Sequence, residues 1–378
     1  MIYLDNSATS FPKPKCVIDA VNDSMMRYGN YGRSSYDMAL KTTEKIYECR
    51  YKVAKFFNAS TENVIFTYNC TTALNMAIKG LSFNGCHFII SDLEHNAVLR
   101  PLETLKNYGI CDYSIAKVER DVYKTIQNFE REIKKNTVAI ICTGASNVFG
   151  VIPPYQYIGS LAHRYNLKFI LDSSQIAGIR KIDLKKDNID ILCCAGHKGL
   201  YGPTGVGLLI LGDNIELNTI IEGGTGSNSM NTSQPSILPD RFESGTPNIS
   251  GIIGLSSAMD FINENGTEKI YNHEISLLKY LQKNIEATKN IKIYTDFFNE
   301  GERKVPVFAF NIVNKPSEEV AELLSNETIC VRAGLHCAPL AHKKYNTEKI
   351  GVIRVSPSIF TKKIQIDFTI NSLFKIAK

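Results

Sequence analysis

The sequence predicts an α/β protein with a mainly parallel sheet of about seven strands, flanked by helices and followed by a smaller α+β unit. Short apolar runs alternate with helical stretches between residues 63 and 211, which is the pattern of a parallel sheet covered on both faces. After residue 250 the pattern changes to two long helical stretches and then short strands. The chain has 378 residues, which exceeds one typical domain.

We place the domain boundary where that pattern changes. Residues 14–250 are expected to form a large domain that binds the ligand, and residues 1–13 together with 251–378 a small α+β domain. The chain shows no internal repeat and no low-complexity linker. The two domains are therefore expected to pack closely against each other.

The N-terminal region precedes the sheet. Residues 1–13 are expected to form an extended arm, because turn and cap formers fill them. A helix follows and ends near Tyr28. A longer amphipathic helix is expected over residues 36–58, with Ser34 or Ser35 as its N-cap.

Short apolar runs predict the strands, and longer periodic stretches predict the helices. The strands of the large sheet are expected at residues 63–67, 86–91, 137–142, 168–172, 189–194 and 205–211. The helices between them are expected at residues 71–79, 96–108 and 153–165. The small domain is expected to contain strands at residues 304–312, 328–332 and 350–356, and a final helix. Ligands bind at the carboxyl ends of the strands in such sheets.

Composition and charge exclude several classes of function. The net charge of +5 comes from interspersed residues without a basic block, so no nucleic-acid partner is expected. No apolar run reaches the length of a membrane span, and the N-terminus lacks a signal-peptide pattern. The ten cysteines are scattered without a CxxC pair, so neither a disulfide framework nor a metal site is expected. We expect a cytoplasmic protein.

Lys198 lies in a loop that leaves one apolar strand and returns into the next. A lysine held between buried strands is partly desolvated, which lowers the pKa of its amine. A neutral amine can form a Schiff base with an aldehyde. The alternative is a surface loop with one solvated lysine, and the apolar flanks argue against it.

Two further features follow strands of the expected sheet. Thr71 lies at a helix start, where backbone N–H groups and a hydroxyl can hold a phosphate. Asp172 ends a strand, and its carboxylate can keep a heteroaromatic nitrogen protonated. Taken alone, either residue could be a simple helix cap. Together with Lys198 they point to pyridoxal 5'-phosphate (PLP) as the cofactor.

A series of motifs covers nearly the whole chain and resembles the cysteine desulfurase family, which are fold-type I PLP enzymes of the class V aminotransferase type. The motifs are Tyr3-Leu-Asp-Asn-Ser-Ala-Thr, Glu94-His95-Asn-Ala, Ser146-Asn147-Val-Phe-Gly, Asp172-Ser-Ser-Gln175, Gly196-His197-Lys198, Arg241-Phe-Glu-Ser-Gly-Thr246, Arg332-Ala-Gly-Leu-His-Cys337 and Ile353-Arg354-Val-Ser. The short segment before Cys337 is similar to the group II, SufS-like members.

The resemblance implies how the cofactor would be held. Lys198 would bind it covalently, His95 would stack on its ring and Asp172 would pair with the ring nitrogen. Asn147 and Gln175 would contact the 3-oxygen of the ring.

The resemblance also implies phosphate and substrate contacts. The phosphate would be bound by Cys70, Thr71 and His197, and by Thr246 of a second subunit. A residue that reaches across subunits implies a homodimer. The substrate carboxylate would be bound by Arg354, together with Arg332 and Asn30.

Cys337 separates a desulfurase from its aminotransferase, lyase and epimerase relatives. In the implied reaction Lys198 removes the Cα proton of L-cysteine, and Cys337 attacks the substrate sulfur. The products are L-alanine and a persulfide on Cys337, which a sulfur-acceptor protein would receive. A thiolate is the nucleophile, and neighbouring cations would lower its pKa.

Three alternatives stay open at this point. Selenocysteine could be the substrate in place of cysteine. If Cys337 is only a structural loop cysteine, the chain would be another PLP-dependent aminotransferase or lyase. The third alternative is a non-catalytic scaffold with the same fold.

Four residues depart from the family pattern. Ala195 replaces a phosphate-binding serine, Gly199 is an extra residue, Thr72 replaces an acidic residue and Leu335 replaces a histidine. These departures bear on the subgroup and the sulfur acceptor more than on the cofactor.

Overall fold

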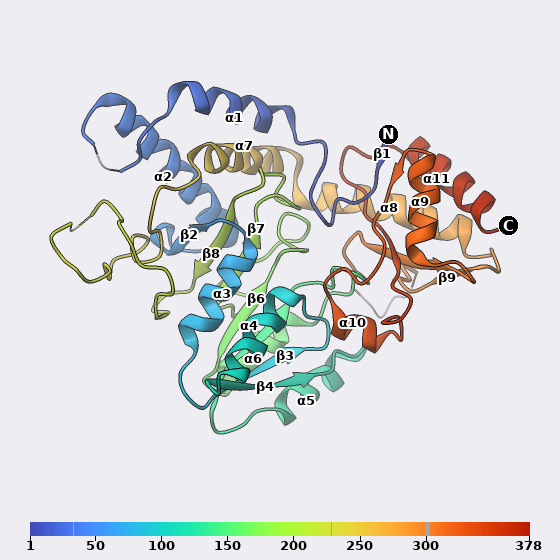
Figure 1. Ribbon diagram of the computed structural model, residues 1–378, viewed down its shortest axis with the longest axis horizontal. Coiled ribbons are helices and arrows are strands. Elements are labelled where there is room, and N and C mark those ends of the chain that lie inside the picture. The colour runs from blue at the N-terminus through green and yellow to red at the C-terminus, as the bar shows by residue number, and fades with distance from the viewer. Residues whose placement is uncertain (33, 228, 299–302) are drawn as a thin grey trace.

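A seven-stranded sheet forms the centre of the larger part of the molecule (Figure 1). The structure is a computed structural model that describes residues 1–32, 34–227, 229–298 and 303–378. The sheet has the order β2-β8-β7-β6-β5-β3-β4, and only β8 runs antiparallel to its neighbours. Its strands are β2 (Val64–Thr67), β3 (Cys86–Ser91), β4 (Cys111–Ala116), β5 (Thr137–Thr143), β6 (Lys168–Asp172), β7 (Ile191–Ala195) and β8 (Gly207–Leu211). The expected mainly parallel α/β fold is confirmed.

The central strands are continuous apolar runs because both faces of the sheet are covered. Every residue of β3, β7 and β8 is buried. Neighbouring residues of one strand enter different cores: Ile140 packs on one face of the sheet and Ile141 on the other. By contrast, the edge strand β4 is half exposed and contains polar residues, so its sequence does not stand out as a strand.

Helices cover both faces of this sheet. Core residues of α2, α6 and α7 share one apolar cluster, and those of α3 and α4 share the other. The helices of this part are α1 (Lys15–Arg27), α2 (Asp37–Phe57), α3 (Cys70–Leu81), α4 (Asn96–Asn107), α5 (Val122–Arg131), α6 (Tyr155–Arg164) and α7 (Ile249–Asn265). The 3-10 turn η1 (Thr61–Asn63) precedes β2. The expected Ser34 or Ser35 cap is wrong, because α2 begins after Tyr36 and no side chain caps it.

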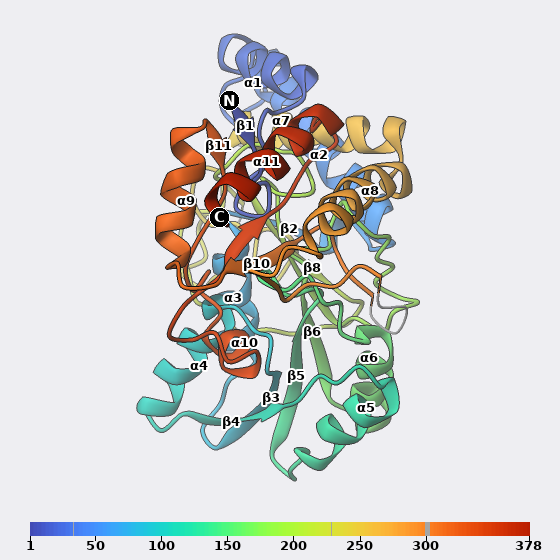
Figure 2. The ribbon, with the colours of Figure 1, turned by 90° about the vertical axis from the view of Figure 1, so that its right-hand side faces the viewer.

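The C-terminal part contains a three-stranded antiparallel sheet with the order β12-β10-β9. It packs with three helices around Phe308, Leu281 and Leu373 (Figure 2). Its elements are α8 (Thr267–Ile285), β9 (Ile291–Ile293), β10 (Phe308–Ile312), α9 (Ser317–Asn326), β11 (Ile329–Cys330), α10 (Pro339–Lys344), β12 (Ile353–Val355) and α11 (Lys363–Ile376). The sequence pattern missed α9, β9 and α10.

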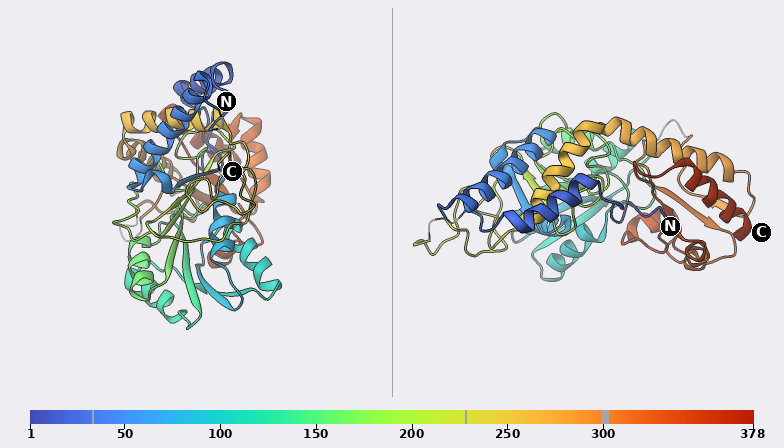
Figure 3. Two further views of the ribbon diagram at one scale, coloured as in Figure 1. Left: turned by 90° about the vertical axis from the view of Figure 1, so that its left-hand side faces the viewer. Right: turned by 90° about the horizontal axis from the view of Figure 1, so that it is seen from above.

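The N-terminal arm belongs to this C-terminal part in space. β1 (Ile2–Tyr3) pairs in parallel with β11, and Leu4 lies in the same apolar core as Phe308. In the right-hand view of Figure 3 both termini lie toward the orange and red C-terminal part, and the blue helices α1 and α2 extend toward the opposite end. The arrangement agrees with the grouping of residues 1–13 and 251–378, although the domain boundaries themselves stay a prediction.

The helices of the described residues include no segment that is both long and apolar enough to cross a membrane.

A buried ion pair joins α2 to the segment that follows β8. Both terminal nitrogens of Arg50 bond to the carboxylate of Glu243, at 2.7 and 2.9 Å. The two side chains are only 3 % and 9 % exposed. The backbone N–H of Phe66 also donates to Glu243, at 2.7 Å. The pair therefore fixes the segment that carries Thr246 against α2 and β2.

Arg50→Ala should lower the free energy of unfolding by about 3–5 kcal/mol, because it leaves the buried Glu243 carboxylate without its counter-charge. Chemical denaturation would measure this loss. Lys15→Ala is the control, since Lys15 and Asp19 form an exposed pair whose removal costs about 1 kcal/mol or less. The double variant Arg50→Met, Glu243→Met should recover most of the stability. Equal losses in Arg50→Ala and Lys15→Ala would contradict the expected cost of an unpaired buried charge.

Candidate active site

One cavity lies at the carboxyl ends of the parallel strands. Thr143, Asp172 and Ala195, the last residues of β5, β6 and β7, all line it. Ligands of parallel α/β sheets bind at this edge. Every residue that the sequence assigned to the cofactor lines the cavity, with the exception of Thr246: Cys70, Thr71, His95, Asn147, Asp172, Gln175, His197 and Lys198.

Lys198 lies in the turn after β7, as the sequence predicts. Burial lowers the pKa of its amine, and the charge of Asp172 offsets part of this shift. The amine is therefore easier to deprotonate than that of a surface lysine. The extra residue at position 199 has to be glycine, because a Cβ at this position would lie 2.4 Å from the carbonyl oxygen of Ala177.

The N-terminal arm holds the residue before Lys198. The carbonyl of His197 accepts hydrogen bonds from the backbone N–H of Ser10 at 3.0 Å and from Nζ of Lys13 at 2.8 Å. Thr9 donates to the same carbonyl at 3.2 Å and contacts Nδ1 of His197 at 3.0 Å. Burial lowers the pKa of Lys13 to about 8 and that of His197 to about 4. The sequence predicts the extended arm but not this attachment to the lysine turn.

Asp172 is oriented by two donors. Its Oδ1 accepts the backbone N–H of Ser174 at 2.9 Å and the thiol of Cys70 at 3.6 Å. Burial, followed by the charge of Asp172, raises the pKa of Cys70 well above its ordinary value, so this thiol is a neutral donor. The amide of Gln175 is held by the carbonyl of Ser7 at 3.0 Å.

The start of α3 borders the cavity. Asn69, which the sequence analysis missed, is the N-cap, and its Oδ1 accepts the backbone N–H of Thr72 at 2.9 Å. The Thr72 hydroxyl donates to the same oxygen at 3.2 Å, which gives this departure from the family pattern a local role. Thr71 is thus not the cap. It is exposed and lines the cavity beside the helix start, where anions are favoured.

His95 caps α4. Its Nδ1 accepts the backbone N–H of Ala97 at 3.0 Å, so the ring hydrogen lies on Nε2. Burial lowers the pKa of His95, and the ring is neutral. The preceding Glu94 is fully buried, and its Oε1 accepts the Ser91 hydroxyl at 2.5 Å and the Thr143 N–H at 2.7 Å. Glu94 therefore joins the ends of β3 and β5 beneath His95.

Arg354 is almost completely buried, with 1 % exposure. Its Nη2 pairs with Asp5 at 2.6 Å and its Nη1 donates to the carbonyl of Asn147 at 2.9 Å. The main chains of Arg332 and Arg354 are joined by two hydrogen bonds, and the side chain of Arg332 is exposed. Asn30 is not brought to this group, because it lies on an exposed loop and bonds to Ser34.

Cys337 is exposed and lies in a tight turn before α10. Its carbonyl accepts the backbone N–H of Asn96 at 2.8 Å, which places the turn beside the start of α4. Burial lowers the pKa of the adjacent His336 to about 3. This imidazole is therefore neutral and is not one of the cations that were expected to lower the pKa of the thiol.

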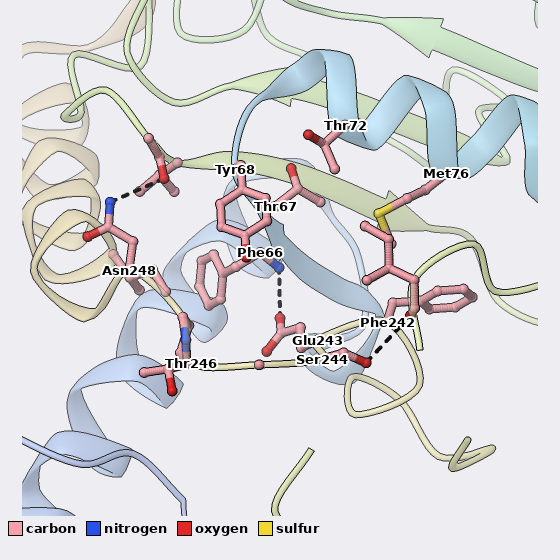
Figure 4. Close-up of a pocket in the computed structure, with 16 residues that line it drawn as sticks. Phe66, Thr67, Tyr68, Thr72, Met76, Phe242, Glu243, Ser244, Thr246 and Asn248 are labelled. Carbon is pink, nitrogen blue, oxygen red and sulfur yellow. Dashed lines mark hydrogen bonds between the residues drawn. The ribbon is translucent and has the colours of Figure 1, made fainter. Parts of the chain in front are cut away.

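Thr246 lies away from this cavity, in a second hollow on the surface (Figure 4). Phe66 and Thr72 line the hollow from β2 and α3, and Glu243 holds its other side. The hydroxyl-bearing side chain of Thr246 is exposed. Within one subunit it does not meet Lys198.

The residues of the first cavity fit PLP. The cavity combines an amine of lowered pKa, an oriented carboxylate, a neutral imidazole and a helix start. Oδ1 of Asn147, a residue that lines this cavity, is buried and has no hydrogen-bond partner in the described part of the chain, so a polar ligand could bond to it. The same part contains no cluster of three or more metal-ligating side chains.

Comparison with known proteins identifies the family. The model of the family "Aminotransferase class-V" matches residues 2–368. A probable cysteine desulfurase of Methanothermobacter thermautotrophicus is 30 % identical over 386 residues, covering 100 % of this chain and 94 % of the relative. A probable cysteine desulfurase of Borreliella burgdorferi is 32 % identical over 394 residues, covering 100 % and 92 %. The apo structure of a cysteine desulfurase from Thermococcus onnurineus NA1 matches with a TM-score of 0.92 at 28 % identity, covering 100 % and 94 %.

The free energy of unfolding of Glu94→Gln, compared with that of the parent protein, should increase as the pH rises from 5 to 8. Burial raises the pKa of Glu94 to about 8 from 4.5, so between these values the folded protein keeps a proton that the unfolded chain loses. This linkage lowers stability with rising pH by up to about 1.4 kcal/mol per pH unit, and glutamine removes it. Denaturation of both proteins across this range would measure the difference in unfolding free energy. A difference that is constant with pH would show that Glu94 is ionised in the fold.

Proposed function

The chain belongs to the aminotransferase class-V family and, within it, to the cysteine desulfurases, and from this premise we propose that it is a PLP-dependent enzyme that converts L-cysteine to L-alanine. The sulfur would stay on Cys337 as a persulfide. One observation carries the proposal: the turn of Cys337 lies next to the cavity of Lys198. The carbonyl of Cys337 accepts the N–H of Asn96, the first residue of α4, and His95, the N-cap of α4, lines the cavity together with Lys198.

The cavity residues would hold the cofactor as follows. Lys198 would bind its aldehyde, Asp172 its ring nitrogen and His95 one face of its ring. Asn147 and Gln175 would contact the 3-oxygen. When bound, PLP supplies an electron sink that stabilises negative charge at the substrate Cα.

The phosphate would lie at the start of α3. Thr71, Cys70 and His197 line the cavity there, and the free N–H groups of a helix start favour an anion. The neutral His197 would act as a hydrogen-bond partner and not as a counter-charge, since burial lowers its pKa to about 4.

Two residues of this chain would carry the chemistry. The Lys198 amine, whose pKa is lowered by burial, would take the proton from Cα. The Cys337 thiolate would attack the substrate sulfur, so that a sulfur–sulfur bond forms as the carbon–sulfur bond breaks. The balance is L-cysteine plus the Cys337 thiol giving L-alanine plus the Cys337 persulfide.

Arg354 would bind the substrate carboxylate, with Arg332 nearby. Its buried Nε has no partner in the described part of the chain, and a guanidinium can bind a carboxylate at two points. Asp5 and the Asn147 carbonyl hold the other side of the group, so its orientation is already set. Asn30 would need a different position of its loop to take part.

The exposure of Cys337 supports transfer of the sulfur to an acceptor protein. The short turn between β11 and α10 supports the group II, SufS-like assignment. L-selenocysteine would fit the same arrangement, because attack at selenium uses the same groups. The cytoplasmic location stays a prediction of the sequence.

Cys337→Ala should lose nearly all production of L-alanine from L-cysteine, because no thiolate is left to accept the sulfur. The purified variant should keep the visible absorbance of the cofactor, since Cys337 does not line the cavity. Cys16→Ala is the matched control, because Cys16 is the other exposed cysteine. L-alanine and sulfide formed at the parent rate by Cys337→Ala would favour another class V activity.

A homodimer would complete the site. Thr246 lies outside the cavity of its own subunit, and one face of α2 carries Leu40, Tyr47 and Tyr51, each about half exposed. An exposed apolar face of this kind is typical of a protein interface. In the proposed dimer Thr246 would reach the phosphate of the partner subunit.

Mixed dimers test this arrangement. Lys198→Ala and Thr246→Ala each damage both sites of their own homodimer. In a mixed dimer, one site combines the intact Lys198 of one subunit with the intact Thr246 of the other. Affinity for PLP at that site should therefore return to the parent value, as measured by titration of co-expressed, differently tagged subunits. Without recovery, Thr246 acts within its own subunit or not at all.

A further inference from the structure

Asn147 lies between Arg354 and the turn that presents Cys337. Its carbonyl accepts a hydrogen bond from Nη1 of Arg354 at 2.9 Å. Its side-chain nitrogen donates to the carbonyl of His336 at 2.7 Å, which belongs to the peptide bond that joins His336 to Cys337. Asn147 is only 8 % exposed, so water competes poorly for either bond.

The turn itself is unfavourable for its sequence. His336 and Cys337 both have positive φ angles, of 47° and 57°, and neither is glycine. Residues with a Cβ rarely adopt this left-handed conformation, and two in succession persist only where the surroundings hold them. The position of the thiol therefore depends on the groups that bond to this turn.

Three hydrogen bonds join His336 and Cys337 themselves to other segments. The Asn147 side chain binds the His336 carbonyl, the N–H of Asn96 binds the Cys337 carbonyl at 2.8 Å, and the His336 ring binds the Val352 carbonyl at 3.0 Å. The bonds of Asn96 and of the His336 ring hold the turn through a main-chain group and a ring. The side chain of Asn147, which lines the cavity, bonds to the peptide group between His336 and Cys337.

The His336 ring helps to hold the turn in place, but it carries no charge. It is buried, lies nearly parallel to His342 with ring centres 6.1 Å apart, and keeps its Nδ1 without a partner among the described residues. A neutral ring cannot attract the thiolate as a cation would. The turn can therefore assist Cys337 by positioning its sulfur, and not by a positive charge on His336.

We propose that Asn147 is a positioning residue for Cys337, because its side chain holds the strained turn and its main chain ties that turn to Arg354. The catalytic meaning of this role rests on the proposed function of Cys337. The role is compatible with a contact to the cofactor, since the second N–H of the amide is still available and its Oδ1 has no partner in the described part of the chain. Asn147 would then join cofactor, substrate carboxylate and nucleophile.

Hydrogen exchange of the holoenzyme tests the structural part. The N–H of Ala338 closes this turn on the Leu335 carbonyl, and the N–H of Gly334 bonds to the Val352 carbonyl just before the turn, so a peptide spanning residues 334–338 reports on its stability. Asn147→Ala should speed exchange in this peptide by about tenfold, the effect of losing one buried hydrogen bond. Asn147→Asp should do the same, because it keeps the size of the side chain and removes the donor.

Asn311→Ala is the matched control. Asn311 is equally buried, its Nδ2 donates to the Gly351 carbonyl at 2.9 Å, and its Oδ1 has no partner among the described residues. Its acceptor, Gly351, lies beside Gly334 but bonds to neither His336 nor Cys337, so exchange at residues 334–338 should stay within about twofold of the parent value. Equal acceleration in Asn311→Ala would mean general loosening and would overturn the proposal, as would unchanged exchange in both Asn147 variants.

A single-turnover measurement tests the catalytic part. One equivalent of L-cysteine is added to each holoenzyme, and the Cys337 persulfide is followed by mass spectrometry. Asn147→Ala should form it about 10²-fold more slowly, the cost of misplacing a reacting group, while the protein still binds PLP. If exchange is faster but even the parent forms no persulfide, the positioning role stands and the proposed function fails. If the parent forms the persulfide and Asn147→Ala matches its rate, the positioning role is wrong.

Discussion

The buried guanidinium of Arg354 is the constraint around which the site is built. A guanidinium with 1 % exposure needs a counter-charge and hydrogen-bond partners to offset the cost of its burial, and Arg354 has them at its two terminal nitrogens. Asp5 from the N-terminal arm and the Asn147 carbonyl from the loop after β5 supply the partners. Since Arg354 itself lies on β12, one side chain joins the beginning, the middle and the end of the chain.

The N-terminal arm extends the same connection to the lysine turn. After Asp5 meets Arg354, the Ser7 carbonyl holds Gln175, and Ser10 with Lys13 holds the carbonyl that precedes Lys198. A segment of about ten residues thus contacts the expected carboxylate, cofactor and lysine positions in order. These hydrogen bonds, together with the pairing of β1 with β11 and the burial of Leu4, hold an arm that has no core of its own.

Much of this could be predicted from the sequence, because the information is local. Apolar runs mark the buried strands, and polar residues directly after them mark the cavity, so Asp172 and Lys198 could be placed from position alone. The edge strand β4 lacks that contrast, since one face is solvated. Contacts between distant segments carry no local signal, which is why the pairing of Asp5 with Arg354 and the attachment of Lys13 to His197 could not be foreseen. The sequence indicates the roles of Asn69 and Glu94 only weakly. Asn69 stands where a helix cap is expected, and Glu94 directly precedes His95.

In the proposed reaction Lys198 and Cys337 have opposite requirements, and the fold gives them different surroundings. An amine that must lose its proton gains from burial, which lowers the pKa of Lys198. A thiol that must pass its sulfur to another molecule has to be exposed, as Cys337 is. Exposure removes the packing that normally fixes a side chain, so the restraint has to act through the backbone. The left-handed turn at residues 336 and 337, bonded to Asn96 and Asn147, provides that restraint and leaves the sulfur itself free.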